Sequence, residues 1–512
     1  MSTTTAQRAS SATGTANAGY RTLWRWHFYA GLFVMPFLIV LAITGTLYCF
    51  QPQIEPLLYP HRLIVEPQAT PRLTEDALLA KARAAMPADA RAVTAPIARA
   101  PDRSTEFIFR LADGEKQSVY LNPYSGEVLG TLSVERRFMQ VDRMLHRKLL
   151  LGKPGELLME LAACWTLVMI GTGVALWWPR EKTTARAALV PRFSLQGRAL
   201  WKNLHAVMGI WLALGALVFV LSGLPWTGSW GKQFKALASA ANLGAPPGSW
   251  GGLPLRSTLP GIRADKHAGT VDAAAETQSA QGAHASANEA SAKEHDAHPP
   301  SMDSMPGMVM DDLPLPLTPW AVGNTPVPQS ADAHAAHALP LGRIVALVAS
   351  LGVPNGYDIV LPTSATGVYT VSYFPADPRD ERTLYIDQYS GTVLKDIRYG
   401  DYGAVSKAVS YGTSLHMGRY FGVANQILCA VMSLGLAGMA VTGCVMWWKR
   451  WWKDRPRRSL GAPSRERAAP PMRGWKTGLV LLGLVFPLMG ATLLAVWLAD
   501  RTIVGRATRQ AV

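Results

Sequence analysis

The sequence predicts an α-helical membrane bundle, with four core helices and a fifth, that carries two extracytoplasmic α+β units. Apolar runs indicate the membrane class, because a helix needs about 20 apolar residues to cross a hydrocarbon core of roughly 30 Å. Five runs are this long: 28–50, 157–178, 206–224, 423–448 and 478–498. The segments between these runs repeat in two copies, which predicts an internal duplication.

The basic charge of the chain follows the expected membrane topology. The formal net charge is +15 at pH 7, and Lys and Arg concentrate before the first helix and in two loops, 181–202 and 449–474. The positive-inside rule places these segments in the cytoplasm and the α+β units outside it. We therefore expect membrane lipid as a partner and no nucleic acid. Arg501, Arg506 and Arg509 follow the fifth helix on the outer side and break the rule.

The expected organisation alternates membrane helices with hydrophilic segments. Membrane helices are expected at 23–50, 141–180, 203–226, 405–448 and 475–499, the second and fourth of them with an outer extension. The α+β units are expected at 51–140 and 339–400, and the remaining segments are the tails 1–22 and 500–512, the basic loops, an outer connector at 227–264 and an insert at 265–338.

The first and third helices share one pattern. His27 lies 18 residues before Gly45, and His205 lies 18 residues before Gly223. Both helices enter the membrane from the cytoplasm, so both histidines are expected near that face.

The second and fourth helices share a different pattern. His146 lies 27 residues before Gly173, and His416 lies 27 residues before Gly443. Both helices enter from outside and end in a Trp-Trp pair followed by basic residues, which is typical of an aromatic belt at a membrane interface. These two histidines are therefore expected at the outer edge of the membrane, on helical extensions.

The first α+β unit combines a helix with a hairpin. The segment 74–86 has the apolar spacing of an amphipathic helix, with Thr74 as its N-cap. Two alternating runs, 106–111 and 117–121, are joined through Asp113-Gly114, which is a strong hairpin signal.

The second unit has the same elements in the same order. It offers a helix over 341–351 and strands near 368–373 and 383–387. Tyr-Ser-Gly followed by an apolar strand closes both units, at Tyr124 in the first and at Tyr389 in the second.

The insert 265–338 has the composition of a disordered segment, rich in Ala, Ser, His and Asp. Thioether and imidazole groups gather in it, and such ligands suit copper. The alternative is a flexible insert whose metal-binding residues are incidental. The copper hypothesis names Met302, Met305, Met308, Met310, His295 and His298.

Four histidines at matched positions favour iron porphyrin over zinc. Zinc needs three or four converging ligands, whereas a haem needs two axial ligands on facing helices. Topology pairs His27 with His205 at the inner face and His146 with His416 at the outer face. Ligation by two histidines leaves iron no open position, which favours electron transfer over oxygen chemistry. The sequence thus predicts two b-type haems.

The chain resembles the PepSY-associated transmembrane helix family. The two Tyr-Ser-Gly units resemble PepSY domains, and the family's helix motifs match Thr44-Gly45, Leu145-His146, Leu204-His205, Ser222-Gly223, Leu415-His416 and Thr442-Gly443. The family includes bacterial inner-membrane proteins that are implicated in reducing ferric siderophores for iron uptake, some of them with two haems. The resemblance therefore implies the inner membrane, with periplasmic α+β units and a cytoplasmic N-terminus.

The function expected from these observations is transfer of electrons to an external metal chelate. A ferric siderophore is the favoured substrate, with copper as the alternative. Some relatives carry a fused flavin and NADPH domain, but this sequence has no such pattern. Quinol or a cytoplasmic flavoprotein is therefore the expected donor. The rival hypothesis is a non-enzymatic PepSY membrane protein that binds peptide or regulates an outer protease, without haem.

Overall fold

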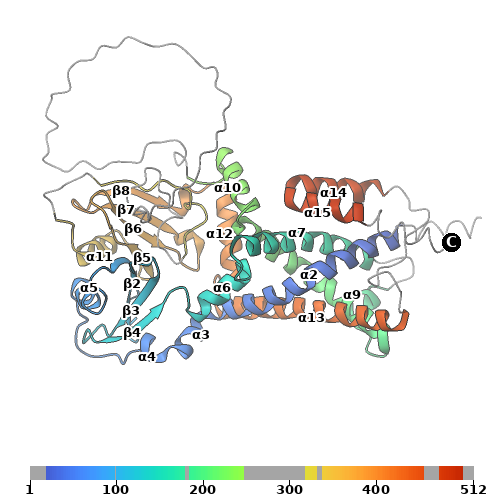
Figure 1. Ribbon diagram of the computed structural model, residues 1–512, viewed down its shortest axis with the longest axis horizontal. Coiled ribbons are helices and arrows are strands. Elements are labelled where there is room, and N and C mark those ends of the chain that lie inside the picture. Colours follow the sequence, from blue (N-terminus) through green and yellow to red (C-terminus); the bar gives the residue numbers. More distant parts are fainter. Residues whose placement is uncertain are drawn as a thin grey trace, which may run out of the picture.

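The computed structural model describes residues 19–98, 100–178, 184–246, 317–330, 337–454 and 472–499. Within these residues, a helical bundle and a β-sheet domain lie one after the other along the longest axis (Figure 1). We call the end of the bundle that carries His146 and His416 the sheet end, and the end that carries Trp177 and Trp447 the distal end. The methionines and histidines of the copper hypothesis lie outside the described residues.

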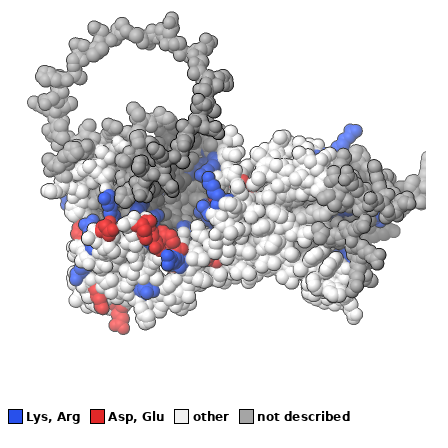
Figure 2. All heavy atoms as spheres, in the orientation of Figure 1, with Lys and Arg blue, Asp and Glu red and all other residues white. Residues whose placement is uncertain are grey.

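Four described helices are long and apolar enough to cross a membrane. They are α2 (Tyr20–Cys49), α7 (Gly152–Trp177), α9 (Gly197–Gly223) and α13 (Val423–Asp454). Both α2 and α9 pack against α7 and against α13, so the four helices form a closed ring with α2 opposite α9. Charged side chains gather on the sheet domain, and the visible flank of the bundle is nearly free of charge (Figure 2).

A short helix precedes each of two membrane helices. α6 (Phe138–Lys148) precedes α7, and α12 (Ala404–His416) precedes α13. The chain turns after each short helix through a left-handed residue, Leu149 with φ 51° and Gly418 with φ 71°. His146 and His416 therefore lie on separate helices at the sheet end. The segments predicted as extensions of the second and fourth membrane helices are helical, but each is a separate helix set off by a turn.

The prediction of a single fifth membrane helix over 475–499 is wrong. The segment forms two helices, α14 (Arg473–Val485) and α15 (Pro487–Ala499), of 13 residues each. At a rise of 1.5 Å per residue, each is about 20 Å long, shorter than a membrane core of roughly 30 Å. The helices lie side by side against the bundle (Figure 1), and a Cβ on Gly490 would lie 2.6 Å from the carbonyl oxygen of Gly483.

Proline explains where this hairpin turns. Pro487 lacks a backbone N–H and cannot continue the hydrogen bonding of α14, but it suits the first position of α15. Two tryptophans anchor the hairpin to the bundle. Trp230 Nε1 donates to the carbonyl oxygen of Val485 at 2.7 Å, and Trp165 Nε1 donates to Thr492 Oγ1 at 2.9 Å. Both ends of the hairpin consequently lie toward the distal end.

Eight antiparallel strands form one sheet in the order β4-β3-β2-β1-β5-β6-β7-β8. The central pair is β1–β5, in which Ala95 lies opposite Ile359. The predicted strands correspond to β2, β3, β6 and β7, and the apolar strands predicted after the two Tyr-Ser-Gly motifs correspond to β4 and β8. The sequence patterns missed β1 and β5. The bounds are β1 (Arg91–Ile97), β2 (Thr105–Arg110), β3 (Lys116–Leu121), β4 (Val128–Ser133), β5 (Tyr357–Val360), β6 (Val368–Tyr373), β7 (Arg382–Asp387) and β8 (Val393–Arg398).

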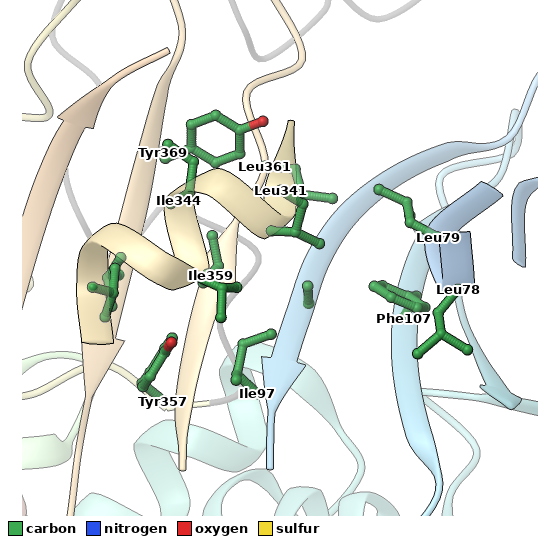
Figure 3. Packing of buried hydrophobic residues seen from close by; sticks show 14 of the residues in the cluster. Leu78, Leu79, Ile97, Phe107, Leu341, Ile344, Tyr357, Ile359, Leu361 and Tyr369 are labelled. Atoms are coloured by element: carbon green, nitrogen blue, oxygen red, sulfur yellow. The ribbon is translucent and has the colours of Figure 1, made fainter. Parts of the chain in front are cut away.

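Two helices, α5 (Glu75–Ala84) and α11 (Leu341–Ser350), cover one face of the sheet. Figure 3 shows leucines of α5 and Leu341 and Ile344 of α11 packed over apolar side chains from the strands. The predicted N-cap of α5 is confirmed, because the Thr74 hydroxyl accepts a hydrogen bond from the backbone N–H of Ala77 at 3.3 Å. We call this apolar side the first face and the opposite side the second face.

Short helices complete the described part of the chain. They are α3 (Gln51–Leu58), α4 (Pro60–Leu63), α8 (Ala185–Leu189), α10 (Trp230–Ala240) and the 3-10 turns η1 (Leu224–Trp226), η4 (Pro378–Asp380) and η5 (Tyr399–Asp401).

Candidate functional site

The four predicted histidines lie in two pairs. The rings of His27 on α2 and His205 on α9 are 6.2 Å apart between centroids, with an interplanar angle of 81°. The rings of His146 on α6 and His416 on α12 are 6.4 Å apart, with an angle of 85°. These are the pairs that topology predicted, the first toward the distal end and the second at the sheet end.

A hydroxyl group on a neighbouring helix holds each histidine ring. In every case the histidine Nδ1 lies within hydrogen-bonding distance of a Thr or Ser that directly precedes a glycine. The four contacts are His27 with Thr172 at 3.0 Å, His146 with Thr44 at 2.8 Å, His205 with Thr442 at 2.8 Å and His416 with Ser222 at 2.8 Å.

The hydrogen bonds of these hydroxyls assign the histidine tautomer. Each hydroxyl also lies within 2.9 Å of a carbonyl oxygen one turn earlier in its own helix, for example Ser222 Oγ at 2.6 Å from the oxygen of Val218. A hydroxyl has one proton, and the carbonyl can only accept it. The hydroxyl therefore accepts from the histidine Nδ1–H, and the lone pair of Nε2 is free to bind a metal.

His27 shows the same tautomer independently. Its Nδ1 lies 3.2 Å from the carbonyl oxygen of Met169, which has no proton to give. Nδ1 must therefore carry the proton. Nε2 of each of the four rings has no hydrogen-bond partner among the described residues.

The glycine after each hydroxyl makes room for the ring. A Cβ at Gly173 would lie 3.2 Å from Cε1 of His27, and a Cβ at Gly45 would lie 3.3 Å from Cε1 of His146. The corresponding distances at Gly223 and Gly443 are both 3.6 Å. We call the four dipeptides Thr44-Gly45, Thr172-Gly173, Ser222-Gly223 and Thr442-Gly443 the histidine seats, because each combines a hydrogen-bond acceptor with a gap for the ring.

A cavity of about 390 Å³ opens between the four helices at the distal pair. Its volume falls within the range of roughly 300 to 1,000 Å³ that is typical of small-molecule and cofactor sites. Most of its lining is apolar, and the charged residues of that lining are all basic: Arg198, Lys202 and Arg450. Such a cavity suits a large apolar ligand that carries acidic groups.

The ring separation in each pair leaves room for one metal ion between the two histidines. Two histidines that hold one metal ion between them through bonds of ~2.0 Å have ring centroids more than ~4 Å apart. The observed separations are 6.2 and 6.4 Å. No group of three or more His, Cys, Asp or Glu side chains within the described residues could hold a metal ion, so the pairs suit a cofactor that supplies its remaining ligands itself.

The sequence patterns identified the four glycines of the seats but not the histidine that each seat holds. The spacings to Gly45, Gly173, Gly223 and Gly443 linked each histidine to a glycine of its own membrane segment. In the structure, each seat instead holds a histidine from another helix, so that Thr172 of α7 supports His27 of α2. This pairing of a seat on one helix with a histidine on another depends on helix packing and cannot be read from spacing along the chain. The three basic cavity residues were assigned to membrane topology alone.

A family model described as PepSY-associated TM region matches residues 24–450. The matched region includes all four histidines, all four seats and the eight-stranded sheet. No match was found among curated proteins.

Proposed function

Because the chain belongs to the family defined by the PepSY-associated TM region, we propose that it is a di-haem membrane protein that transfers electrons to a metal chelate. The observation that carries this proposal is the geometry of the two histidine pairs. All four Nδ1 atoms are held by a hydroxyl, and the centroid separations of 6.2 and 6.4 Å suit one metal ion between the rings of each pair.

Each pair would hold one b-type haem. When bound, a haem whose two axial ligands are histidines supplies reversible one-electron transfer. His27 and His205 would ligate the first from α2 and α9, and His146 and His416 would ligate the second from α6 and α12. The seats fix each ring and raise the basicity of Nε2 through the Nδ1 hydrogen bond.

The cavity residues supply the rest of the distal site. The apolar lining excludes water, and Gly31 and Gly209 leave space beside the ligands. Arg198, Lys202 and Arg450 would pair with the acidic groups of a porphyrin, since arginine and lysine bind carboxylates through charge-assisted hydrogen bonds.

We further propose the direction of transfer. The basic loops at the distal end would lie in the cytoplasm by the positive-inside rule, and the sheet domain would lie in the periplasm of a bacterial inner membrane. Quinol or a cytoplasmic flavoprotein would supply electrons at the His27–His205 pair. The acceptor would receive them at the His146–His416 pair, beside the sheet.

A ferric siderophore is the favoured acceptor, in keeping with a role in iron uptake. Copper is the alternative, because the segment 295–310 contains Met and His residues that suit Cu(I). Two chromogenic assays separate these substrates: reduction of a ferric chelate measured with a ferrous-specific chelator, and reduction of a cupric salt measured with a cuprous-specific chelator.

The absorbance spectrum tests the proposal directly. Protein purified in detergent should show a Soret band that sharpens and shifts on addition of dithionite, together with resolved α and β bands. The expected content is two haems per chain. A colourless preparation from cells supplied with haem precursor would overturn the proposal and leave the peptide-binding PepSY protein as the better hypothesis.

A further inference from the structure

A row of polar side chains lies on the second face of the sheet. Asp358, Ser372 and Thr383 lie side by side on β5, β6 and β7, each opposite the next in the strand register. Ser372 is 2% exposed and Thr383 is not exposed, and neither hydroxyl has a hydrogen-bond partner among the described residues. Glu381 lies two residues before Thr383 and contacts Ser410 of α12.

Glu381 is a buried carboxyl whose hydrogen-bond partners are hydroxyl groups. It is 2% exposed. Its Oε2 accepts a hydrogen bond from Ser410 Oγ of α12 at 3.2 Å, and the hydroxyl of Tyr402 is a second donor to the carboxyl. A buried carboxylate without an ion pair is costly, and burial raises the pKa of Glu381 to about 7.

The charged and titratable groups that face Glu381 are few. Arg419, from the turn between α12 and α13, is the nearby cation, and its guanidinium donates to the carbonyl oxygen of Phe374 at 2.5 Å. Tyr399 of η5 and Tyr402 after it complete the surroundings. Because the guanidinium is engaged with a backbone oxygen, Glu381 can gain and lose a proton without breaking an ion pair.

Helix α12 connects Glu381 to the sheet-end histidine pair. Ser410 precedes His416 by six residues on this helix, which corresponds to about 9 Å along its axis. Ser406, Ser410 and Ser414 recur every four residues and are all buried, so they form a hydroxyl stripe on one side of α12. Ser406 Oγ has no partner among the described residues, and unpaired buried hydroxyls of this kind are commonly bridged by internal water.

We propose that Glu381 binds the proton that balances an electron arriving at the His146–His416 pair. The inference rests on the proposed function. One electron from the donor reaches the pair, and one proton from water on the sheet side converts the Glu381 carboxylate to a carboxylic acid, so that the net charge of this region is unchanged. A negative charge about 10 Å away raises the proton affinity of a carboxylate on the order of tenfold at an effective dielectric constant of 20.

A redox titration tests the proposal. We expect the midpoint potential of the sheet-end centre to fall as pH rises from 6 to 8, and Glu381→Gln to abolish this dependence. Glu381→Asp should retain it. Asp358→Asn is the matched control: Asp358 is a half-buried carboxyl on the second face, but it lies two strands farther from α12, and this variant should keep the dependence.

A second variant and a second readout keep the proposal testable if Glu381→Gln fails to fold. Ser410→Ala removes the hydrogen bond to the charged form of Glu381, so it should move the pH dependence to higher pH. Infrared spectroscopy of the protein without haem should detect carboxylic-acid absorption that grows between pH 8 and pH 6. Glu381→Gln should lose one component of this absorption and keep the component from Asp358, which Asp358→Asn should remove instead.

The outcomes separate the inference from the proposed function. A colourless protein would overturn the proposed function, and the infrared band would still show whether Glu381 binds a proton near neutral pH. A coloured protein whose potential does not depend on pH, or whose Glu381→Gln variant keeps the dependence, would overturn the role of Glu381 and leave the proposed function standing.

Discussion

His416 on α12 donates from Nδ1 to the hydroxyl of Ser222 on α9 across 2.8 Å, and the Ser222 hydroxyl donates in turn to the carbonyl oxygen of Val218. This relay fixes the ring of a residue on a short helix outside the membrane segment against a helix inside it. The other three seats use threonine at the same place. The seats are therefore the element that converts four separate histidines into two opposed pairs.

Removing the Ser222 hydroxyl should weaken the sheet-end site. In Ser222→Ala, Nδ1 of His416 loses its acceptor and the ring loses its fixed orientation. We expect haem affinity at this pair to fall roughly tenfold, as is typical when a metal-binding histidine loses the hydrogen bond of its other ring nitrogen. Ser222→Thr preserves the hydroxyl and should bind haem like the wild type. The measurement is haem content per chain after dialysis. Equal content in the two variants would contradict the role assigned to the seat.

The glycines of the seats can be tested on a single helix. A Cβ at Gly173 would lie 3.2 Å from Cε1 of His27, whereas a Cβ at Gly171 meets nothing within 4 Å. Gly173→Ala should displace His27 and lower haem content at the distal pair, because a contact of 3.2 Å forces the ring to shift. Gly171→Ala, two residues away on α7, should leave the spectrum unchanged. Identical spectra of the two variants would contradict this account.

The helices and the histidine pairs could be predicted because their signals are local. Apolar length identifies a membrane helix, charge sets its direction, and direction decides that His27 belongs with His205. The strands β1 and β5 could not be predicted in the same way. They are joined to each other at Ala95 and Ile359 across more than 250 residues of chain, and no local pattern encodes such a pairing.

Loss of one histidine should empty one site only. In His416→Ala, the sheet-end pair loses a ligand, but His27 and His205 keep their own seats on α7 and α13. We expect about half of the haem to be lost and the remaining α band to be unchanged in position. His205→Ala should produce the complementary spectrum. Loss of all haem in both variants would show that the two sites are not independent.

The hairpin of α14 and α15 removes an inconsistency in the charge pattern. As a single span, 475–499 would have carried Arg501, Arg506 and Arg509 to the side opposite the other basic segments. As a hairpin that turns before Pro487, it returns the chain to the side from which it entered. Apolar length alone could not distinguish these cases, because two helices of 13 residues and one span have nearly the same composition.

Reporter fusions test this topology. A reporter attached after residue 454, at the end of α13, and one attached after residue 499, at the end of α15, should report the same side of the membrane. A reporter after Gly223, at the end of α9, should report the opposite side, because α9 and α13 run in opposite directions between the two ends of the bundle. Reporters after residues 454 and 499 that lie on opposite sides of the membrane would show that 475–499 crosses the membrane as a single helix.

The pH dependence of stability should reveal the burial of Asp358. Burial, reinforced by the negative charge of Glu106, raises the pKa of Asp358 to about 7, whereas an unfolded aspartate titrates near pH ~4. Between pH ~4 and about pH 7, the folded state therefore keeps a proton on Asp358 that the unfolded state has already released. The stability that this proton confers is fully present below about pH 4 and is lost as pH rises through about 7.

Asp358→Asn removes this titration. The variant should be more stable than the wild type at pH 8, by at most about 4 kcal/mol, and the difference should shrink toward pH 5. Thermal unfolding in detergent, followed by circular dichroism at both pH values, provides the measurement. Asp89→Asn, at an exposed position before β1, is the control and should leave the thermal stability unchanged at both pH values. A variant of Asp358 that is equally destabilised at both pH values would show that the carboxyl has a structural contact instead.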